Sequence, residues 1–381
     1  MSGTSSAPRG LDNVVAVQTR LSHVDGQNGV LIIGGYELKA LAGSVTFEEA
    51  AHLLWTGRLP DRSEAHALSR EIAALRTIPE RTMTLVCDAA TRGASPIDTL
   101  RMACATLSLD TVDADDISHD ADISTAKMLV ARFPTVVAAH TRAAAGQEPI
   151  APRLDLSLAA NFLYMLSGKE PDPIAARALD TYWVTVIDHG MNASTFTARV
   201  IASTRSDMVS AVTGAIGALK GPLHGGAPGP VLDMLMDIRT ADNAEPWVRR
   251  ELAAGRRIMG FGHRVYKVRD PRAEVLARVA EEMAGAALQN RTLFELGRAV
   301  EKTALRVLDD VKPGRNLKTN VEFYTALVLQ SIGLRPATFV AMFACGRSAG
   351  WCAHVIEQHA EDRLIRPQSE YIGPAASTVQ G

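Results

Sequence analysis

Residues 172–192 read DPIAARALDTYWVTVIDHGMN and carry a complete helix signal. Asp172 is a residue type that caps helix N-termini, and Pro173 follows at the first helical position, where its missing N–H costs nothing. Apolar side chains then recur at helical spacing, at Ile174, Ala178, Leu179, Trp183, Val186 and Ile187. Gly190 interrupts this pattern, and Asn192 has the properties of a cap for a second helix. The stretch therefore predicts two helices separated by a short break.

The same signals recur along the chain. Thr46 and Glu49 are spaced as a capping box, and Asp61 precedes apolar residues at helical spacing. Ser95 and Asp270 each stand directly before a proline, which predicts two further helix starts. Because no internal repeat or low-complexity segment interrupts this pattern, the predicted fold class is all-α, a two-domain helical fold.

Strand signals are scarce. The best is the apolar run Val30–Ile33 before Gly34 and Gly35, and we expect it to pair with residues 14–17 in a small N-terminal β-hairpin. Turn signals bracket residues 220–330, where we predict a small helical domain. The large helical domain would then consist of residues 1–219 and 331–381.

The composition excludes several classes of protein. The 381 residues are 47% hydrophobic, enough for a sizeable core, and 40 basic residues nearly balance 42 acidic ones, so no global field attracts nucleic acid or a membrane surface. No apolar run reaches the length of a membrane span, and the polar residues 1–10 do not resemble a signal peptide. The four cysteines have neither zinc-site spacing nor the density of a disulfide scaffold, so we expect a cytoplasmic protein.

Three histidines stand at breaks between predicted helices. His189 precedes Gly190, His224 lies in the sequence GPLHGG, and His263 lies in MGFGHR. A histidine beside glycines exposes its ring nitrogens, and its tunable charge suits hydrogen-bond donation to a carbonyl or general acid catalysis. For any one of them the alternative is a solvated histidine or one that caps a carbonyl. A metal site is a weaker alternative, since no two of them share a helix face at close spacing.

Basic residues gather in residues 249–272, with eight basic residues against two acidic ones. Such a cluster is either a solvated helix face or a local site for phosphates and carboxylates, and the neighbouring glycines favour the second. Arg347 lies in the apolar helical run of residues 339–355, where a charge needs a partner or a ligand. Glu322 falls in the first turn of a helix capped by Asn320, where the helix dipole stabilises any carboxylate and would equally hold a base ionised.

Four stretches resemble the citrate synthase family, and they read DHGMNASTFTAR at 188–199, GPLHGGA at 221–227, MGFGHRVYK at 259–267 and DPR at 270–272. The resemblance extends over roughly residues 11–373 and includes NFLYML at 161–166, GWCAH at 350–354 and RPQSEY at 366–371, all in the family's order. It implies a large helical domain, a smaller one that closes over the ligands, and a homodimer whose two active sites both need the partner chain.

The resemblance also implies a reaction. An acyltransferase of this kind condenses acetyl-CoA with oxaloacetate and hydrolyses the adduct to citrate and free coenzyme A, with no metal and no permanently bound cofactor. His224 would donate a hydrogen bond to the thioester oxygen while Glu322 removes a proton from the acyl carbon. His263 would polarise the oxaloacetate carbonyl.

The remaining site residues would bind the two substrates. The oxaloacetate carboxylates would be held by His189, Arg272 and Arg347, joined by Arg366 of the partner subunit. Coenzyme A would be contacted by the backbone at Gly260 and Gly262 and by the side chain of Lys267.

Two departures from the family pattern bear on substrate and rate. Most members carry Asp where this chain has Glu322, and their Tyr-Arg-Gly near the hairpin is here Ile33-Gly34-Gly35. One alternative is a 2-methylcitrate synthase that uses propionyl-CoA, since one methylene in an apolar pocket is worth only about 1–3 kcal/mol. Another is a weakly active or inactive paralogue that binds coenzyme A or oxaloacetate as a regulator, although the retained histidines and arginines argue against it. A reversed, lyase-type reaction is more distant.

Overall fold

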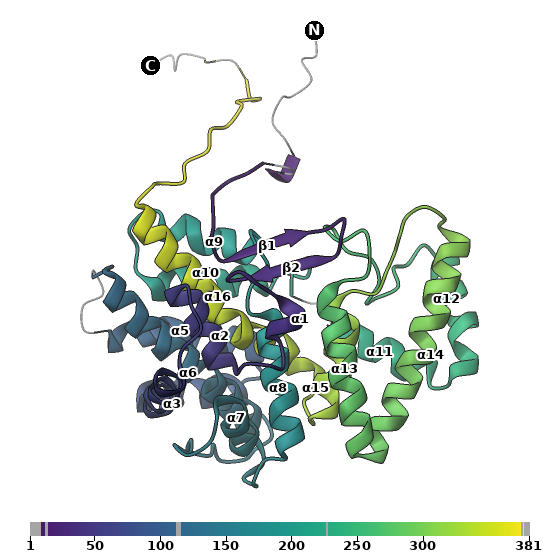
Figure 1. The fold of residues 1–381 in the computed structure, drawn as a ribbon, viewed down its shortest axis with the longest axis horizontal. Coiled ribbons are helices and arrows are strands. Elements are labelled where there is room, and N and C mark those ends of the chain that lie inside the picture. Colours follow the sequence, from purple (N-terminus) through teal and green to yellow (C-terminus); the bar gives the residue numbers. More distant parts are fainter. Residues whose placement is uncertain (1–8, 12–13, 112–115, 226–227, 375, 377–381) are drawn as a thin grey trace, which may run out of the picture.

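The computed structural model describes residues 9–11, 14–111, 116–225, 228–374 and 376, and these are mostly helical (Figure 1). The helices are α1 (Leu38–Leu41), α2 (Phe47–Thr56), α3 (Arg62–Leu75), α4 (Glu80–Thr91), α5 (Pro96–Thr106), α6 (His119–Ala143), α7 (Leu158–Ser167), α8 (Pro173–Val186), α9 (Ala193–Ala202), α10 (Met208–Leu219), α11 (Pro228–Ile238), α12 (Ala244–Ala253), α13 (Pro271–Ala286), α14 (Leu288–Val311), α15 (Val321–Ser331) and α16 (Phe339–Glu361). A small antiparallel sheet has the order β1 (Ser22–Asp25), β2 (Val30–Ile33), β3 (Tyr36–Glu37). The all-α prediction is confirmed.

The predicted helix starts are confirmed, and the predicted capping residues form their hydrogen bonds. The Thr46 side chain accepts the backbone N–H of Glu49, whose side chain accepts that of Thr46, so both halves of the capping box are formed. Asp61 caps α3 in the same way. The side chains of Ser95 and Asp270 cap α5 and α13, each with proline in the first turn.

The hairpin prediction was right for β2 and wrong for its partner. β2 pairs with β1, Ser22–Asp25, whereas residues 14–17 form no strand. The reason is the turn: the Asp25 carboxylate accepts the backbone N–H groups of Gln27 and Asn28, both at 3.0 Å, and this local turn joins β1 directly to β2. Proximity along the chain thus decided the pairing over the apolar character of residues 14–17.

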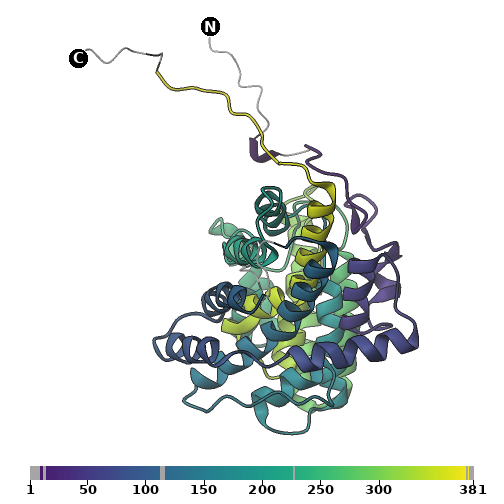
Figure 2. The ribbon, with the colours of Figure 1, turned by 90° about the vertical axis from the view of Figure 1, so that its left-hand side faces the viewer.

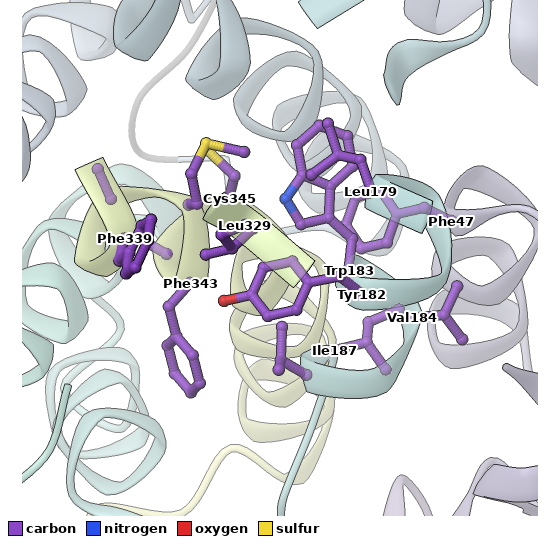
Figure 3. Close-up of a cluster of buried hydrophobic side chains, with 14 of the residues drawn as sticks. Phe47, Leu179, Tyr182, Trp183, Val184, Ile187, Leu329, Phe339, Phe343 and Cys345 are labelled. Atoms are coloured by element: carbon purple, nitrogen blue, oxygen red, sulfur yellow. The ribbon is translucent and has the colours of Figure 1, made fainter. Parts of the chain in front are cut away.

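Helix α16 forms the centre of the core, with α2, α5, α6, α8, α9 and α10 packed around it. Figure 3 shows part of this buried core, where Trp183 of α8 packs against Phe47 of α2 and Tyr182 of α8 points toward Phe343 of α16. Among the described residues, the segment Pro336–Glu361 is the one helix long and apolar enough to cross a membrane, and 94% of its apolar stretch is buried inside the protein. This degree of burial is expected of the central helix of a globular core.

The positions of helices α11–α14 and of the two terminal segments matter for the site. Helices α11, α12, α13 and α14 gather on one side of the molecule, beside the helices around α16 (Figure 1). These helices fall within the predicted small domain of residues 220–330, and the division into domains stays a prediction. The described parts of the two terminal segments leave the helical body at the same end (Figure 2).

Candidate active site

A cleft of about 1330 Å³ lies between the hairpin turn, the loop of residues 257–267 and the ends of several helices. Nine of the ten predicted site residues line it, namely His189, His224, Gly260, Gly262, His263, Lys267, Arg272, Glu322 and Arg347. The tenth, Arg366, lies elsewhere. Residues far apart in the sequence therefore meet in one hollow.

His189 is positioned by the break between α8 and α9. The buried carboxylate of Asp188 accepts a hydrogen bond from the Ser22 hydroxyl at 2.5 Å, and the backbone N–H of Gly190 donates to that hydroxyl oxygen at 3.0 Å. Nε2 of the buried His354 lies 3.3 Å from the same carboxylate. Because Ser22 belongs to β1, the small sheet holds the His189 loop in place.

Tyr266 joins two of the three histidines. Its hydroxyl lies 3.1 Å from Nε2 of His189, and its ring centroid is 4.8 Å from that of His263. The two histidine rings are 5.6 Å apart. Burial, followed by the charges of Arg272, Arg347 and His263, lowers the pKa of His189 well below its usual value. His189 is therefore a neutral ring at neutral pH.

The proton of His263 is fixed by the backbone. Its Nδ1 accepts the N–H groups of Val265 and Tyr266, at 3.0 and 3.1 Å, so a neutral ring carries its hydrogen on Nε2. Burial and the neighbouring Arg272 lower the pKa of His263 to about 4, which keeps the ring neutral. Nε2 lies 3.3 Å from Nη2 of Arg272. Two donors side by side require a shared acceptor, such as a substrate oxygen.

His224 has the opposite tautomer. The backbone N–H of Ser194 donates to its Nε2 at 3.4 Å, and the Ser194 hydroxyl lies 2.8 Å from the same nitrogen. The Trp351 indole N–H donates to that hydroxyl oxygen at 3.1 Å. Since Nε2 accepts, the hydrogen of the neutral ring lies on Nδ1. Burial, with the charge of Arg347, lowers the pKa of His224 to about 4.

Arg272 stands in the first turn of α13 and forms a two-point ion pair with Asp270. The guanidinium Nη2 and Nε lie 2.8 and 3.0 Å from the two carboxylate oxygens. The same carboxylate accepts the N–H of Val321 at 3.2 Å, in the first turn of α15. Burial lowers the pKa of Arg272, but Asp270 more than compensates and the net shift is upward. The pair therefore fixes a charged guanidinium at the cleft wall.

Arg347 projects from α16 into the cleft. Its Nε donates to the backbone oxygen of Val186 at 2.6 Å, and its guanidinium lies 4.8 Å from the centre of the Phe343 ring. Among the described residues, no carboxylate lies within ion-pairing distance of it. Burial lowers its pKa to about 10, so the group is still charged at neutral pH. The predicted need for a ligand at Arg347 thus has a structural basis.

Glu322 occupies the first turn of α15, and the cap by Asn320 is confirmed: the Asn320 side chain accepts the Glu322 N–H at 3.1 Å. Burial raises the pKa of Glu322 to about 7, opposed by Arg272 and Arg347 and reinforced by Asp270. A carboxyl group that titrates near neutral pH beside a cleft has the properties of a general base.

Seven of the eight basic residues of segment 249–272 divide into two groups, and the eighth, Arg269, pairs with Glu301. One forms surface ion pairs with Glu245 or Glu251 and consists of Arg249, Arg250 and Arg256. The other lines the cleft and consists of Arg257, Arg264, Lys267 and Arg272. Both predicted interpretations of the cluster therefore hold, each for part of it.

The loop of residues 257–267 brings its backbone close to the cleft. Gly260 and Gly262 have φ values of +84° and +86°, a left-handed conformation that disfavours side chains, and a Cβ at Gly260 would lie 2.8 Å from the Phe323 ring. The Asn320 amide donates to the backbone oxygen of Gly262 at 2.8 Å, which ties this loop to the Glu322 helix. Lys267 lies further along the same loop.

Arg366 lies in the C-terminal segment that leaves the body after α16 (Figure 2). It lines a smaller hollow of about 300 Å³ beside the cleft, and the two hollows share the lining residues Leu11, Val14, Ala16 and Phe196. Within one chain, the structure does not bring Arg366 to the cleft.

Sequence reasoning assigned no role to several residues that hold the site. Ser194 and Asp188 lie inside the family-like stretch 188–199, so their position next to His189 was visible but their partners were not. Tyr266 likewise lies in the stretch 259–267. Ser22 carries no local signal, because its contact with Asp188 exists only in the folded chain.

Residues 10–368 match the family model described as citrate synthase, C-terminal domain, which covers nearly the whole chain. The chain belongs to the citrate synthase family. It is thus an acyltransferase of the citrate synthase type, as the sequence predicts.

Relatives and solved structures agree with this membership. The chain is 39% identical to citrate synthase 2 of Bacillus subtilis, over 97% of this chain and 96% of the relative. It is 37% identical to the citrate/2-methylcitrate synthase of the same species, over 97% of both chains. The citrate synthase of Thermoplasma acidophilum, solved with carboxymethyl coenzyme A and oxaloacetate, superposes with a TM-score of 0.90 at 29% identity and 99% coverage of both chains.

The second departure that the sequence predicts, glycine at position 34, is compatible with the local structure. Gly34 has a φ of +54°, and a Cβ there would lie 2.7 Å from the Leu53 side chain. An arginine at this position would therefore strain the backbone and displace Leu53 from the core. The hairpin of this citrate synthase family member is built around a glycine at that point.

Proposed function

We propose that the chain condenses acetyl-CoA with oxaloacetate and hydrolyses the adduct, releasing citrate and free coenzyme A. The observation that carries the proposal is that one cleft combines two neutral histidine donors, two buried arginines and a carboxyl group whose pKa is about 7. A base and a hydrogen-bond donor can convert a thioester to its enolate, and a second donor can activate the carbonyl group that the enolate attacks.

The acyl half of the reaction falls to Glu322 and His224. Glu322, ionised in about half of the molecules near its pKa of about 7, removes a proton from the acyl carbon. His224 donates from Nδ1 to the thioester oxygen, where negative charge develops, while Ser194 holds its Nε2. A preorganised donor of this kind is commonly worth around 3 kcal/mol in the transition state. The product of this step is the enolate nucleophile, whose oxygen accepts the hydrogen bond from Nδ1 of His224.

The oxaloacetate half falls to His263 and the arginines. His263 donates from Nε2 to the oxaloacetate carbonyl oxygen, which makes the carbonyl carbon more electrophilic. Arg272 and Arg347 bind the two carboxylates, since each guanidinium presents paired donors to a carboxylate. His189, next to both arginines, completes this side of the cleft.

Coenzyme A enters as the thioester substrate, and the proposal requires no permanently bound cofactor. Its contacts would be the backbone of Gly260 and Gly262 and the ammonium group of Lys267, all on the loop at the mouth of the cleft. The ternary complex of the Thermoplasma relative with a coenzyme A analogue and oxaloacetate supports these two ligands for this fold. We further propose a homodimer in the cytoplasm, in which Arg366 of the partner subunit completes the carboxylate site.

The experiment is to measure free thiol released when the purified protein is mixed with oxaloacetate and either acetyl-CoA or propionyl-CoA. We expect turnover with acetyl-CoA in the wild type and a loss of at least about a hundredfold in His224→Ala, because an oxyanion donor is removed. His66→Ala, at an exposed position of α3, is the matched control and should retain full turnover.

The same experiment decides between the alternatives. Propionyl-CoA is a necessary arm, because the chain is nearly as similar to a citrate/2-methylcitrate synthase as to a citrate synthase. A higher kcat/KM with propionyl-CoA would replace the acetyl assignment by the 2-methylcitrate one. No thiol release with either thioester, together with saturable oxaloacetate binding, would refute catalysis and leave a regulatory paralogue.

A further inference from the structure

The hydroxyl of Tyr182 is a buried polar group that the reaction as described above does not use. The Tyr182 side chain has no exposed surface, and no described protein atom forms a hydrogen bond with its hydroxyl. A buried hydroxyl without a partner destabilises the fold, whereas a phenylalanine ring would fill the same space without that cost. A tyrosine in this place therefore calls for a function.

The helix that carries Tyr182 brings it to the wall of the active site. Tyr182 and Val186 are four residues apart on α8, so they share a helix face. The side chains of Val186 and Trp183 pack against Gly346 of α16, and the next residue, Arg347, donates to the backbone oxygen of Val186 and stacks on Phe343. Figure 3 shows the hydroxyl of Tyr182 pointing toward Phe343 and away from Trp183. The hydroxyl thus faces the contact region between α8 and α16 directly behind the cleft.

The charged groups around this hydroxyl are those of the active site. It lies within electrostatic range of the carboxyl of Glu322, the thiol of Cys345 and the guanidinium groups of Arg347 and Arg272. Of these, only the Glu322 carboxylate is a strong hydrogen-bond acceptor, because guanidinium groups only donate and a thiol is a weak partner. Helix α15, which carries Glu322, packs directly against α8.

We propose that Tyr182 is a positioning residue for Glu322: its hydroxyl donates a hydrogen bond to the Glu322 carboxylate when that group is ionised, and so orients it toward the acyl carbon. This inference rests on the proposed role of Glu322 as the base. The glutamate side chain has one more rotatable bond than an aspartate in the same place, and a fixed donor behind it restricts that added freedom.

The donor also acts on the ionisation of the base. The groups that face Glu322 come from three elements: Arg272 and Asp270 from the start of α13, Arg347 from α16, and Tyr182 from α8. Burial raises the pKa of the Tyr182 phenol well above its ordinary value, so the hydroxyl keeps its proton and remains a donor. A hydrogen bond to a carboxylate favours its ionised form, which makes more of the base available at neutral pH.

The test is Tyr182→Phe, assayed for thiol release across pH, with Tyr164→Phe as the control. Tyr164 lies on α7 outside the cleft lining, and its removal should change nothing in the assay. In Tyr182→Phe we expect kcat to fall about tenfold or more, with the KM for oxaloacetate unchanged, because a hydrogen bond to a charged group is lost. The acidic limb of the kcat profile should move to higher pH, and the melting temperature should stay equal or rise.

Two further measurements keep the proposal separate from the assignment of the base. If Glu322→Gln retained full turnover, the base assignment itself would fail, whatever Tyr182→Phe did. If Glu322→Gln is inactive but Tyr182→Phe keeps the wild-type kcat and pH profile, the Tyr182 proposal is wrong and the proposed function stands. The Tyr182 proposal would also be wrong if Tyr182→Phe raised the KM for oxaloacetate and left the acidic limb of the kcat profile unchanged. The hydroxyl would then act through Arg347. Replacing Tyr182 by 3-fluorotyrosine, a stronger donor, should shift the limb to lower pH.

Discussion

Glu322 is the residue at which the sequence predicts a departure from the aspartate of most family members. Its backbone is held by the Asn320 cap, and Asn320 in turn ties α15 to the glycine loop. The added methylene carries the carboxyl group further from this fixed backbone than an aspartate would reach. The charges of Arg272, Arg347 and Asp270 act on the carboxyl group at this position.

We therefore predict that Glu322→Asp lowers kcat on the order of a hundredfold, since a misplacement of about 1 Å in a catalytic group has an effect of this size. The KM for oxaloacetate should change little, because Arg272, Arg347 and His263 are intact. Steady-state thiol release over a range of oxaloacetate concentrations measures both constants.

Glu322→Gln sets the baseline for this comparison, because it keeps the length of the side chain and removes the base. A gain in turnover in Glu322→Asp would contradict the prediction and would mean that the natural glutamate weakens an active site suited to aspartate.

At the scale of elements, one carboxylate connects two helices and the side chain of Arg272. Asp270 caps α13, accepts the N–H of Val321 in the first turn of α15, and pairs with Arg272. The proposed base, Glu322, and the proposed substrate-binding Arg272 are thus positioned by the same buried group. Helix α13 also packs on α8 and α15, so this junction links the body to the helices beside it.

We predict that Asp270→Asn destabilises the protein by about 3–5 kcal/mol, because it leaves the buried Arg272 without its counter-charge. Asp172→Asn is the matched control: Asp172 also caps a helix with proline in its first turn, but it is exposed and pairs with no arginine. Asparagine caps a helix N-terminus as effectively as aspartate does, so the control substitution should change the free energy of unfolding by less than about 0.5 kcal/mol. Urea unfolding monitored by circular dichroism compares the two. Equal effects would show that Asp270 acts only as a cap.

The elements were predictable from the sequence wherever their signals are local. A cap such as Thr46 with Glu49 involves neighbours four positions apart at most, and both sides of the interaction are visible in the sequence. The pairing of β2 was mispredicted because the prediction rested on the apolar residues 14–17, whereas the turn at Asp25 that joins β1 to β2 is a polar signal. Strand pairing is decided by such turns more than by apolar content.

The site was predictable to the extent that its residues lie in recognisable stretches. His224, His263 and the arginines stood out through the glycines and the apolar runs around them. The groups that orient them did not, because a contact such as Ser22 with Asp188 spans 166 residues along the chain. Tyr182 gave no signal either, since its place on an apolar helix face is that of any core residue.

At the scale of the whole molecule, the terminal segments expose apolar side chains that a single chain does not cover. Val15, Tyr371 and Ile372 are 86%, 76% and 88% exposed, which is unusual for apolar side chains in a folded protein. Arg366 precedes Tyr371 in the C-terminal segment and lines the hollow beside the cleft, but it is not among the residues that line the cleft of its own chain. A second copy of the chain would cover these apolar residues and receive Arg366 in its cleft.

This arrangement predicts complementation between two inactive variants. Arg366→Ala and His224→Ala should each form inactive dimers, and mixing them under conditions that exchange subunits should restore activity. In a mixed dimer, the cleft of the Arg366→Ala chain has an intact His224 and receives Arg366 of the partner subunit, the His224→Ala chain, so that one site is complete. With free exchange, about a quarter of all sites should be active, with thiol release as the measure. If Arg366 instead acted within its own chain, no cleft in the mixture would be complete, and the activity would stay at the level of the separate variants.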